Sequence, residues 1–153
     1  KDLRYLDPKT NEKYIPHVIE PTFGLSRLTG TTIIDAYREE DVKGEKRVYL
    51  KFAPSVAPIK VAVFPLQKDE KLREMAQTIY KEIKSHYVSE FDDNGNIGKM
   101  YRRQDEIGTP LCVTIDFASL EDQSVTVRNR DTMKQERVPT ASLLAYIRET
   151  LGI

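Results

Sequence analysis

Two apolar, β-branched runs constrain the fold of this chain more than any other feature. They are IKVAVFPL at residues 59–66 and PLCVTIDF at residues 110–117, and each has the length and composition of a strand covered on both faces. Between them, Asp69 is a favourable N-cap for a helix whose apolar residues recur at helical spacing from Leu72 to Tyr87. A strand, a helix and another strand in this order predict a mostly parallel sheet with right-handed crossovers.

The remaining elements of the second half complete this sheet. They are a short strand at residues 87–91, a helix over residues 97–107 that stops at Gly108, a hairpin formed by SVTVRN and KQERV, and a last helix beginning around Pro139 and Thr140. We therefore predict an α/β fold, a five-stranded mixed sheet flanked by three helices, for residues 57–153.

The first third of the chain has weaker signals. YIPHVIE at residues 14–20 predicts a strand that enters a turn at Pro21, and a helix is expected over residues 23–40. The charged run at residues 38–47 is interpreted as a solvated helix end and loop. Because KFAPSVAPIK at 51–60 contains two prolines and small residues, we place a domain boundary near Ala57, with one unit at 1–56 and another at 57–153.

Composition excludes several classes of protein. The formal net charge is +0, so any binding of nucleic acid must come from a local arrangement of donors. No apolar run is long enough to span a bilayer, so a membrane protein is not expected. The one cysteine, Cys112, lies in an apolar strand and suits packed core and a reducing compartment, and with two histidines it offers no zinc-ligand spacing. No metal site is expected.

Two groups of residues could carry chemistry. Glu20 precedes Pro21 and could receive an ammonium group, while the guanidinium of Arg27 could stack on a base or bind a phosphate; a surface ion pair between Glu20 and Arg27 is the simpler alternative. YRRQDEIG at residues 101–108 places several charges at a helix end, which a solvated helix face would also explain. No arrangement of Ser, His and Asp predicts nucleophilic catalysis.

Taken in order, these segments resemble the carboxy-terminal part of a class II glycyl-tRNA synthetase. PHVIEPTFGLSR resembles motif 3 of that family, and three later stretches resemble its anticodon-binding domain. Those stretches are APIKVAVFPL, FDDNGNIGKMYRRQDEIGTPLCVTIDF and VRNRDTMKQERV. The resemblance implies that residues 1–56 are the end of the catalytic domain, a strand and helix including motif 3, and that residues 57–153 are the anticodon-binding domain. The resemblance covers essentially the whole chain from Tyr14. Since the chain opens on Lys1 without an apolar signal segment, we expect it to be part of a longer protein.

The resemblance implies roles for the residues of the motif 3 segment. Glu20 would hold the ammonium of glycine and contribute to the ATP site, Thr22 would line the amino-acid pocket where the family commonly has serine, and Arg27 would stack on adenine. The full-length enzyme is expected to be a cytoplasmic homodimer that uses ATP and Mg²⁺ to form glycyl-adenylate and then charges tRNA(Gly). Motifs 1 and 2 are absent from this chain, so we expect it to need no cofactor and to be inactive by itself.

The anticodon of tRNA(Gly) supplies two cytosines, whose amino donor and ring acceptors are complementary to an acidic side chain beside an arginine. We predict a tRNA-facing set in YRRQDE and VRNRD. Its members are Arg102, Arg103, Asp105, Glu106, Arg128 and Arg130. Two alternatives remain, namely a non-catalytic accessory protein with an anticodon-binding-type domain and a class II synthetase for another amino acid.

Overall fold

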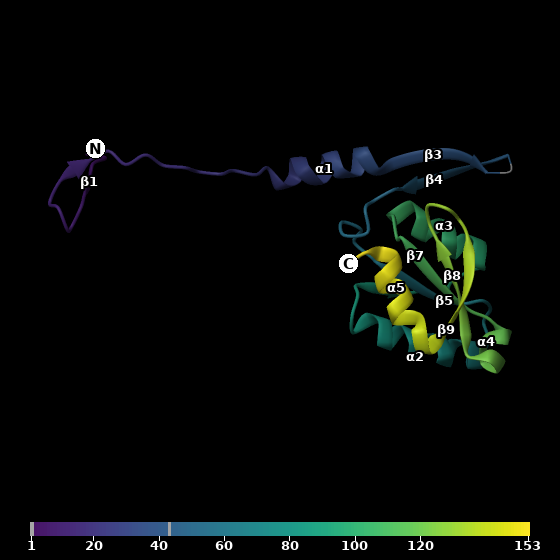
Figure 1. Ribbon diagram of the computed structural model, residues 1–153. Coiled ribbons are helices and arrows are strands. Elements are labelled where there is room, and N and C mark those ends of the chain that lie inside the picture. Colours follow the sequence, from purple (N-terminus) through teal and green to yellow (C-terminus); the bar gives the residue numbers. More distant parts are fainter. Residues whose placement is uncertain (1, 43) are drawn as a thin grey trace.

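The computed structural model describes residues 2–42 and 44–153, and its main feature is a five-stranded mixed sheet (Figure 1). The strand order is β6-β5-β7-β8-β9. The strands are β5 (Val61–Pro65), β6 (Ser89–Phe91), β7 (Leu111–Ile115), β8 (Ser124–Asn129) and β9 (Gln135–Pro139). β5 pairs in parallel with β6 and β7, whereas β8 pairs antiparallel with β7 and β9. The predicted fold class is confirmed.

The three predicted helices of this unit are present, and the chain forms two further short helical segments. They are α2 (Glu70–Lys84), α3 (Ile97–Ile107) and α5 (Leu143–Leu151), with the unpredicted α4 (Phe117–Asp122) and the 3-10 turn η1 (Thr140–Ser142). Asp69 caps α2 as predicted, because its carboxylate accepts hydrogen bonds from the backbone N–H groups of Lys71 and Leu72. Gly108 ends α3 in the left-handed conformation that glycine adopts without strain.

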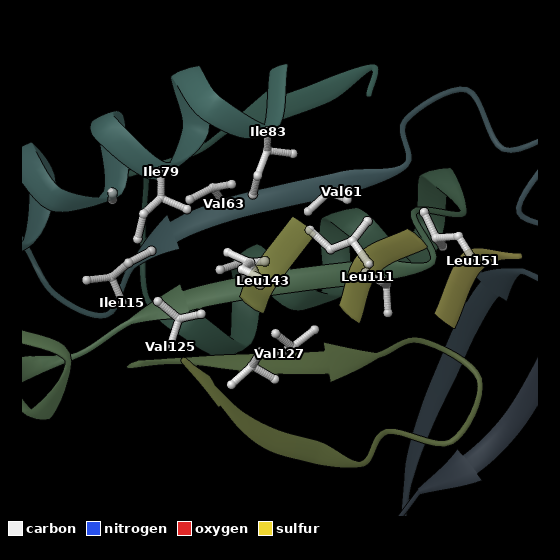
Figure 2. Packing of buried hydrophobic residues seen from close by; sticks show 14 of the residues in the cluster. Val61, Val63, Ile79, Ile83, Leu111, Ile115, Val125, Val127, Leu143 and Leu151 are labelled. Carbon is white, nitrogen blue, oxygen red and sulfur yellow. The ribbon is translucent and has the colours of Figure 1, made fainter. Parts of the chain in front are cut away.

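The two faces of the sheet bury different side chains. Val61 and Val63 of β5 point into the larger core with residues of α2 and α5 (Figure 2), while Ala62 and Phe64 point to the opposite face. On that opposite face they pack with Cys112 of β7 and Met100 of α3. Cys112 is therefore core, as predicted, and α3 is fixed against the sheet through Met100.

The first third of the chain differs from the prediction. Its elements are β1 (Tyr5–Leu6), β2 (Lys13–Tyr14), α1 (Leu25–Ala36), β3 (Tyr37–Val42) and β4 (Glu45–Leu50). The strand predicted at 14–20 is wrong beyond Tyr14, since residues 15–24 form no regular structure and reach away from the sheet (Figure 1). A strand needs a partner for its backbone groups, and this segment has none in the described parts of the chain.

The predicted helix over 23–40 ends at Ala36, and the charged run at 38–47 is a hairpin rather than a helix end and loop. Charges on the two strands pair across it, as Lys46 does with Glu39 at 2.7 Å. The hairpin packs on α3, and Ala36, Phe52 and Ala57 form a small core below it. No helix in the part of the chain described here is long and apolar enough to cross a membrane.

Candidate nucleic-acid interface

The three parallel strands end side by side, and polar residues follow each of them. Val63 of β5 is paired with Phe91, the last residue of β6, and Pro65 at the end of β5 is paired with Ile115, the last residue of β7. Ligands of open α/β sheets bind outside the carboxyl ends of such strands. We call the residues there the carboxyl edge. They are Gln67 to Arg73, Asp92 to Asn94, Asp116, Asp122 and Arg137.

The loop at residues 92–94 is held from two helices. Arg103 of α3 donates from Nε to Asp92 at 3.0 Å and also donates to the carbonyl oxygen of Asn94. Arg73 of α2 pairs with Asp93 at 3.1 Å. Asn94 is exposed, and within residues 2–42 and 44–153 its side-chain amide makes no hydrogen bond. The loop therefore presents one unpaired amide on a fixed backbone.

Beside this loop lies a surface hollow of about 220 Å³, lined in part by Lys68, Arg73, Asp93 and Asn94. It is smaller than the pockets of about 300–1,000 Å³ that take drug-sized ligands. A single flat base suits this size better than an extended cofactor does.

A second polar group lies across the neighbouring strands. Thr114 of β7 faces Thr126 of β8, which faces Arg137 of β9. Arg137 donates to Asp116 at 2.6 Å and to Asp122 at 3.2 Å. This arginine and its two carboxylates thus lie toward the end of the sheet where β7 stops.

Both carboxylates are held in the ionised form. Burial raises the pKa of Asp116, but hydrogen bonds from Arg137 and Ser119 together outweigh it, so that the pKa lies below its ordinary value. The pKa of Asp122 is also lowered, chiefly by hydrogen bonds from Ser124. At neutral pH the edge therefore offers acceptors beside the donors of Arg137.

These groups match the chemistry of an unpaired cytosine. A cytosine offers one amino donor and adjacent ring acceptors, and it can be bound by a side-chain amide or by a carboxylate beside an arginine. The free amide of Asn94 is of the first kind and the Arg137 pair is of the second. RNA is read in this way where its bases are unstacked in single-stranded loops.

The predicted tRNA-facing residues separate into an exposed and a buried group. Arg102, Arg103 and Glu106 are exposed on α3, and Arg102 pairs with Glu45 of the hairpin at 3.0 Å. Asp105, Arg128 and Arg130 are buried. The structure therefore brings the first three to the surface and encloses the other three.

The buried group is a network of charges around Asp105. Arg128 donates to both carboxylate oxygens at 2.8 and 3.0 Å, and Arg47 of β4 donates from Nε at 2.9 Å. Arg128 also stacks on the ring of Tyr101 at 4.7 Å. Arg130 donates to the carbonyl oxygens of Gly108 and Phe52. In this structure the three residues fix α3 against β4 and β8.

The predicted glycine and ATP residues lie in the irregular segment and at the start of α1. Glu20, Thr22 and Arg27 are exposed, and none of their side chains makes a hydrogen bond or ion pair within the described residues. The alternative of a Glu20–Arg27 ion pair is thus absent too. These three exposed residues alone do not enclose glycine, ATP or Mg²⁺.

Sequence reasoning missed Arg73, Asn94, Asp116 and Arg137. Two of these could have been found, because Asn94 lies three residues after the predicted strand at 87–91, Asp116 lies near the end of the predicted strand at 110–117, and the ends of parallel strands meet at one edge. Arg73 and Arg137 had no comparable signal, since only the crossing of α2 and the register of β9 place them there.

Comparisons with known proteins identify a family and similar proteins for this chain. A family model described as "Anticodon binding domain" matches residues 60–150. The chain is 52% identical over 152 residues to the glycine-tRNA ligase of Clostridium acetobutylicum, covering 99% of this chain and 32% of that protein. It is 47% identical over 151 residues to the glycine-tRNA ligase of Bacillus anthracis, with 99% and 32% covered. The chain thus spans 32% of the length of these curated relatives.

A solved structure shares the fold. The prolyl-tRNA synthetase of Cryptosporidium parvum, complexed with halofuginone and AMPPNP, superimposes with a TM-score of 0.62 at 24% identity. The match covers 67% of this chain and 22% of that one.

Proposed function

This chain belongs to the anticodon-binding domain family, and we propose that it is the anticodon-reading part of a glycine-tRNA ligase. The observation that carries the proposal is the carboxyl edge, where Asn94 offers a free amide on a loop held by Arg73 and Arg103. The two anticodon cytosines of tRNA(Gly) are the proposed ligands. Asn94 would bind one of them, and Arg137 with Asp116 would bind the other.

The exposed residues of α3 have a supporting role in this proposal. Arg102 and Arg103 would neutralise phosphates next to the bases, and Glu106 would limit how closely the backbone approaches. Asp105, Arg128 and Arg130 would hold α3 in position without contacting tRNA, because they are buried and bound to protein atoms.

The complete ligase is proposed to join glycine to tRNA(Gly) with ATP and Mg²⁺ through glycyl-adenylate, as a cytoplasmic homodimer. In it, Glu20 and Thr22 would contact glycine and Arg27 would contact ATP, with the rest of the pocket supplied by other parts of the protein. Their exposure in this chain is consistent with that arrangement, since side chains that line a pocket together with other parts of a protein are exposed when those parts are not there.

The proposal is tested by charging tRNA(Gly) transcripts with glycine, using the complete ligase. Replacing either anticodon cytosine with uridine should lower kcat/KM by about tenfold or more, because each good base contact contributes about 1–3 kcal/mol of discrimination. Pyrophosphate exchange that depends on glycine should not change, since it needs no tRNA. Charging that is indifferent to both cytosines, or exchange that depends on another amino acid, would contradict the proposal.

The isolated chain should bind tRNA weakly. Its net charge is +0, so release of counterions by a few basic residues provides little affinity. Filter binding in low salt measures this directly. Nanomolar affinity for the chain alone would show that the anticodon-reading part does not depend on the rest of the ligase for docking.

A further inference from the structure

Two side chains of helix α3, two positions apart in the sequence, bind two separate segments of the chain. Arg103 binds Asp92 and the carbonyl oxygen of Asn94, and Asp105 binds Arg47 of the β3–β4 hairpin at 2.9 Å. The loop that carries the proposed cytosine contact and the hairpin are therefore attached to one rigid helix.

The contact between the hairpin and α3 is buried, and Arg47 makes several interactions there. The side chains of Arg47 and Asp105 are 8% and 5% exposed. Arg47 also donates to the carbonyl oxygen of Arg130 at 2.7 Å, and its guanidinium lies 4.2 Å above the ring of Tyr49. A two-stranded hairpin is at best marginally stable in water by itself, so these contacts determine where it lies.

The hairpin is in turn attached to the end of α1. Lys51, which follows β4, donates its backbone N–H to the carbonyl oxygen of Ala36 at 2.7 Å. Ala36 is the last residue of α1 and is buried with Phe52 and Ala57. A continuous set of contacts thus runs from the 92–94 loop through α3 and the hairpin to the helix that contains Arg27.

We infer that Arg47 and Asp105 are positioning residues, which fix the anticodon-reading unit relative to α1 so that a tRNA bound by its anticodon is correctly placed for charging. This inference rests on the proposed function. The β3–β4 hairpin is then a part of the anticodon-reading unit, and an error in its position is an error in the position of the bound tRNA.

Arg47→Met in the complete ligase is the decisive variant. It removes the hydrogen bonds that join the hairpin to Asp105 and to the carbonyl oxygen of Arg130, together with the pair between Arg47 and Glu40 within the hairpin, and it leaves Asp105 bound to both donors of Arg128. Lys46→Met is the matched control, since Lys46 is a neighbouring cation whose partner, Glu39, lies within the same hairpin. The Arg47 variant should lose about tenfold to a hundredfold in kcat for charging with little change in KM, because small misplacements cost about this much. Pyrophosphate exchange should be unchanged in both variants, and charging should be unchanged in Lys46→Met.

A tRNA with both anticodon cytosines replaced separates positioning from general damage. It does not engage the reading unit, so Arg47→Met should lower its charging by less than threefold. An equal loss with both tRNAs, or no loss with the cognate one, overturns the inference. If wild-type ligase ignores the anticodon, the proposed function itself fails.

Amide hydrogen exchange on this chain tests the structural half of the inference without any tRNA. In Arg47→Met, amides of residues 37–42 and 44–50 should exchange at least tenfold faster, while those of β5 and β7 keep their protection. Unchanged exchange in the hairpin overturns the inference. If the Met variant unfolds throughout, Arg47→Lys, which keeps the charge but loses the two-pronged geometry, is measured in both assays with the same two outcomes.

Discussion

The guanidinium of Arg130 donates a 2.8 Å hydrogen bond to the carbonyl oxygen of Phe52, although 78 positions separate the two residues. The same guanidinium donates to the carbonyl oxygen of Gly108 at 2.7 Å, and the residue is 1% exposed. Residues on the two sides of the predicted division at 57 are therefore in direct contact. The segment after the hairpin is fixed to the sheet by a buried guanidinium that donates to two backbone carbonyl oxygens and is paired with the carboxylate of Asp131 at 2.8 Å.

Asp105→Ala should lower the free energy of unfolding by about 3–5 kcal/mol, because it leaves the buried Arg47 and Arg128 without their shared partner. Urea unfolding of the chain measures this change. Glu106→Ala removes an exposed carboxylate next to it and should stay within about 0.5 kcal/mol of wild type. Equal effects of the two substitutions would contradict the account of the network.

Gly108→Ala should also lower the free energy of unfolding, by about 1–3 kcal/mol or more. Its φ is +85°, and an added Cβ would lie 2.5 Å from the Phe52 ring and 2.8 Å from the carbonyl oxygen of Leu50. Gly98→Ala is the control, because a Cβ there would meet only an ordinary contact at 3.6 Å, and alanine favours a helix. The control should be neutral or more stable in the same urea experiment; a tolerated Gly108→Ala would show that the Phe52 segment moves freely.

Stability should fall in acid, and part of that fall should belong to Asp116. Its pKa in the folded chain lies below the ordinary value of 3.8, so its ionised form stabilises the fold above that value. This contribution is lost as the pH falls through the folded pKa. Asp116→Asn should accordingly flatten the dependence of the unfolding free energy on pH below about pH 4. Parallel curves for wild type and variant would show that the contacts with Arg137 and Ser119 do not persist in solution.

Cys112 should not react with thiol reagents in the folded chain. Burial raises the pKa of its thiol far above the ordinary value of 9.0, and the side chain packs with Ala62, Phe64 and Met100. A thiol reagent such as dithionitrobenzoate should modify Cys112 in the folded chain only as fast as the chain unfolds. In denaturant the modification should be complete. Rapid modification under native conditions would mean that α3 opens from the sheet.

The sheet could be predicted from sequence because its signals are local. The apolar runs at 59–66 and 110–117, the N-cap Asp69 and the stop at Gly108 each act over a few residues, and the structure confirms all of them. The β3–β4 hairpin was missed because its strands carry many charges, and their stability comes from pairing across the hairpin and from contact with α3.

The site was predicted less well, for a related reason. Charge identified YRRQDE and VRNRD, but charge does not distinguish an arginine that faces solvent from one that is buried with Asp105. That distinction depends on which side of α3 packs against β4 and β8. Asn94 was missed because it lies in a loop that a simple turn explains, and only the network of Arg73 and Arg103 shows that its position is fixed.

Photocrosslinking of tRNA(Gly) to the complete ligase shows whether the carboxyl edge contacts the anticodon cytosines. A photoreactive pyrimidine in place of either anticodon cytosine should attach to peptides of the carboxyl edge, from residues 92–94 or from the segment around Asp116 and Arg137. Asn94→Ala should weaken the first attachment and Lys134→Ala, at the β8–β9 turn, should leave both intact. Attachment to residues 84–89, which lead into the opposite end of β6, would contradict the account.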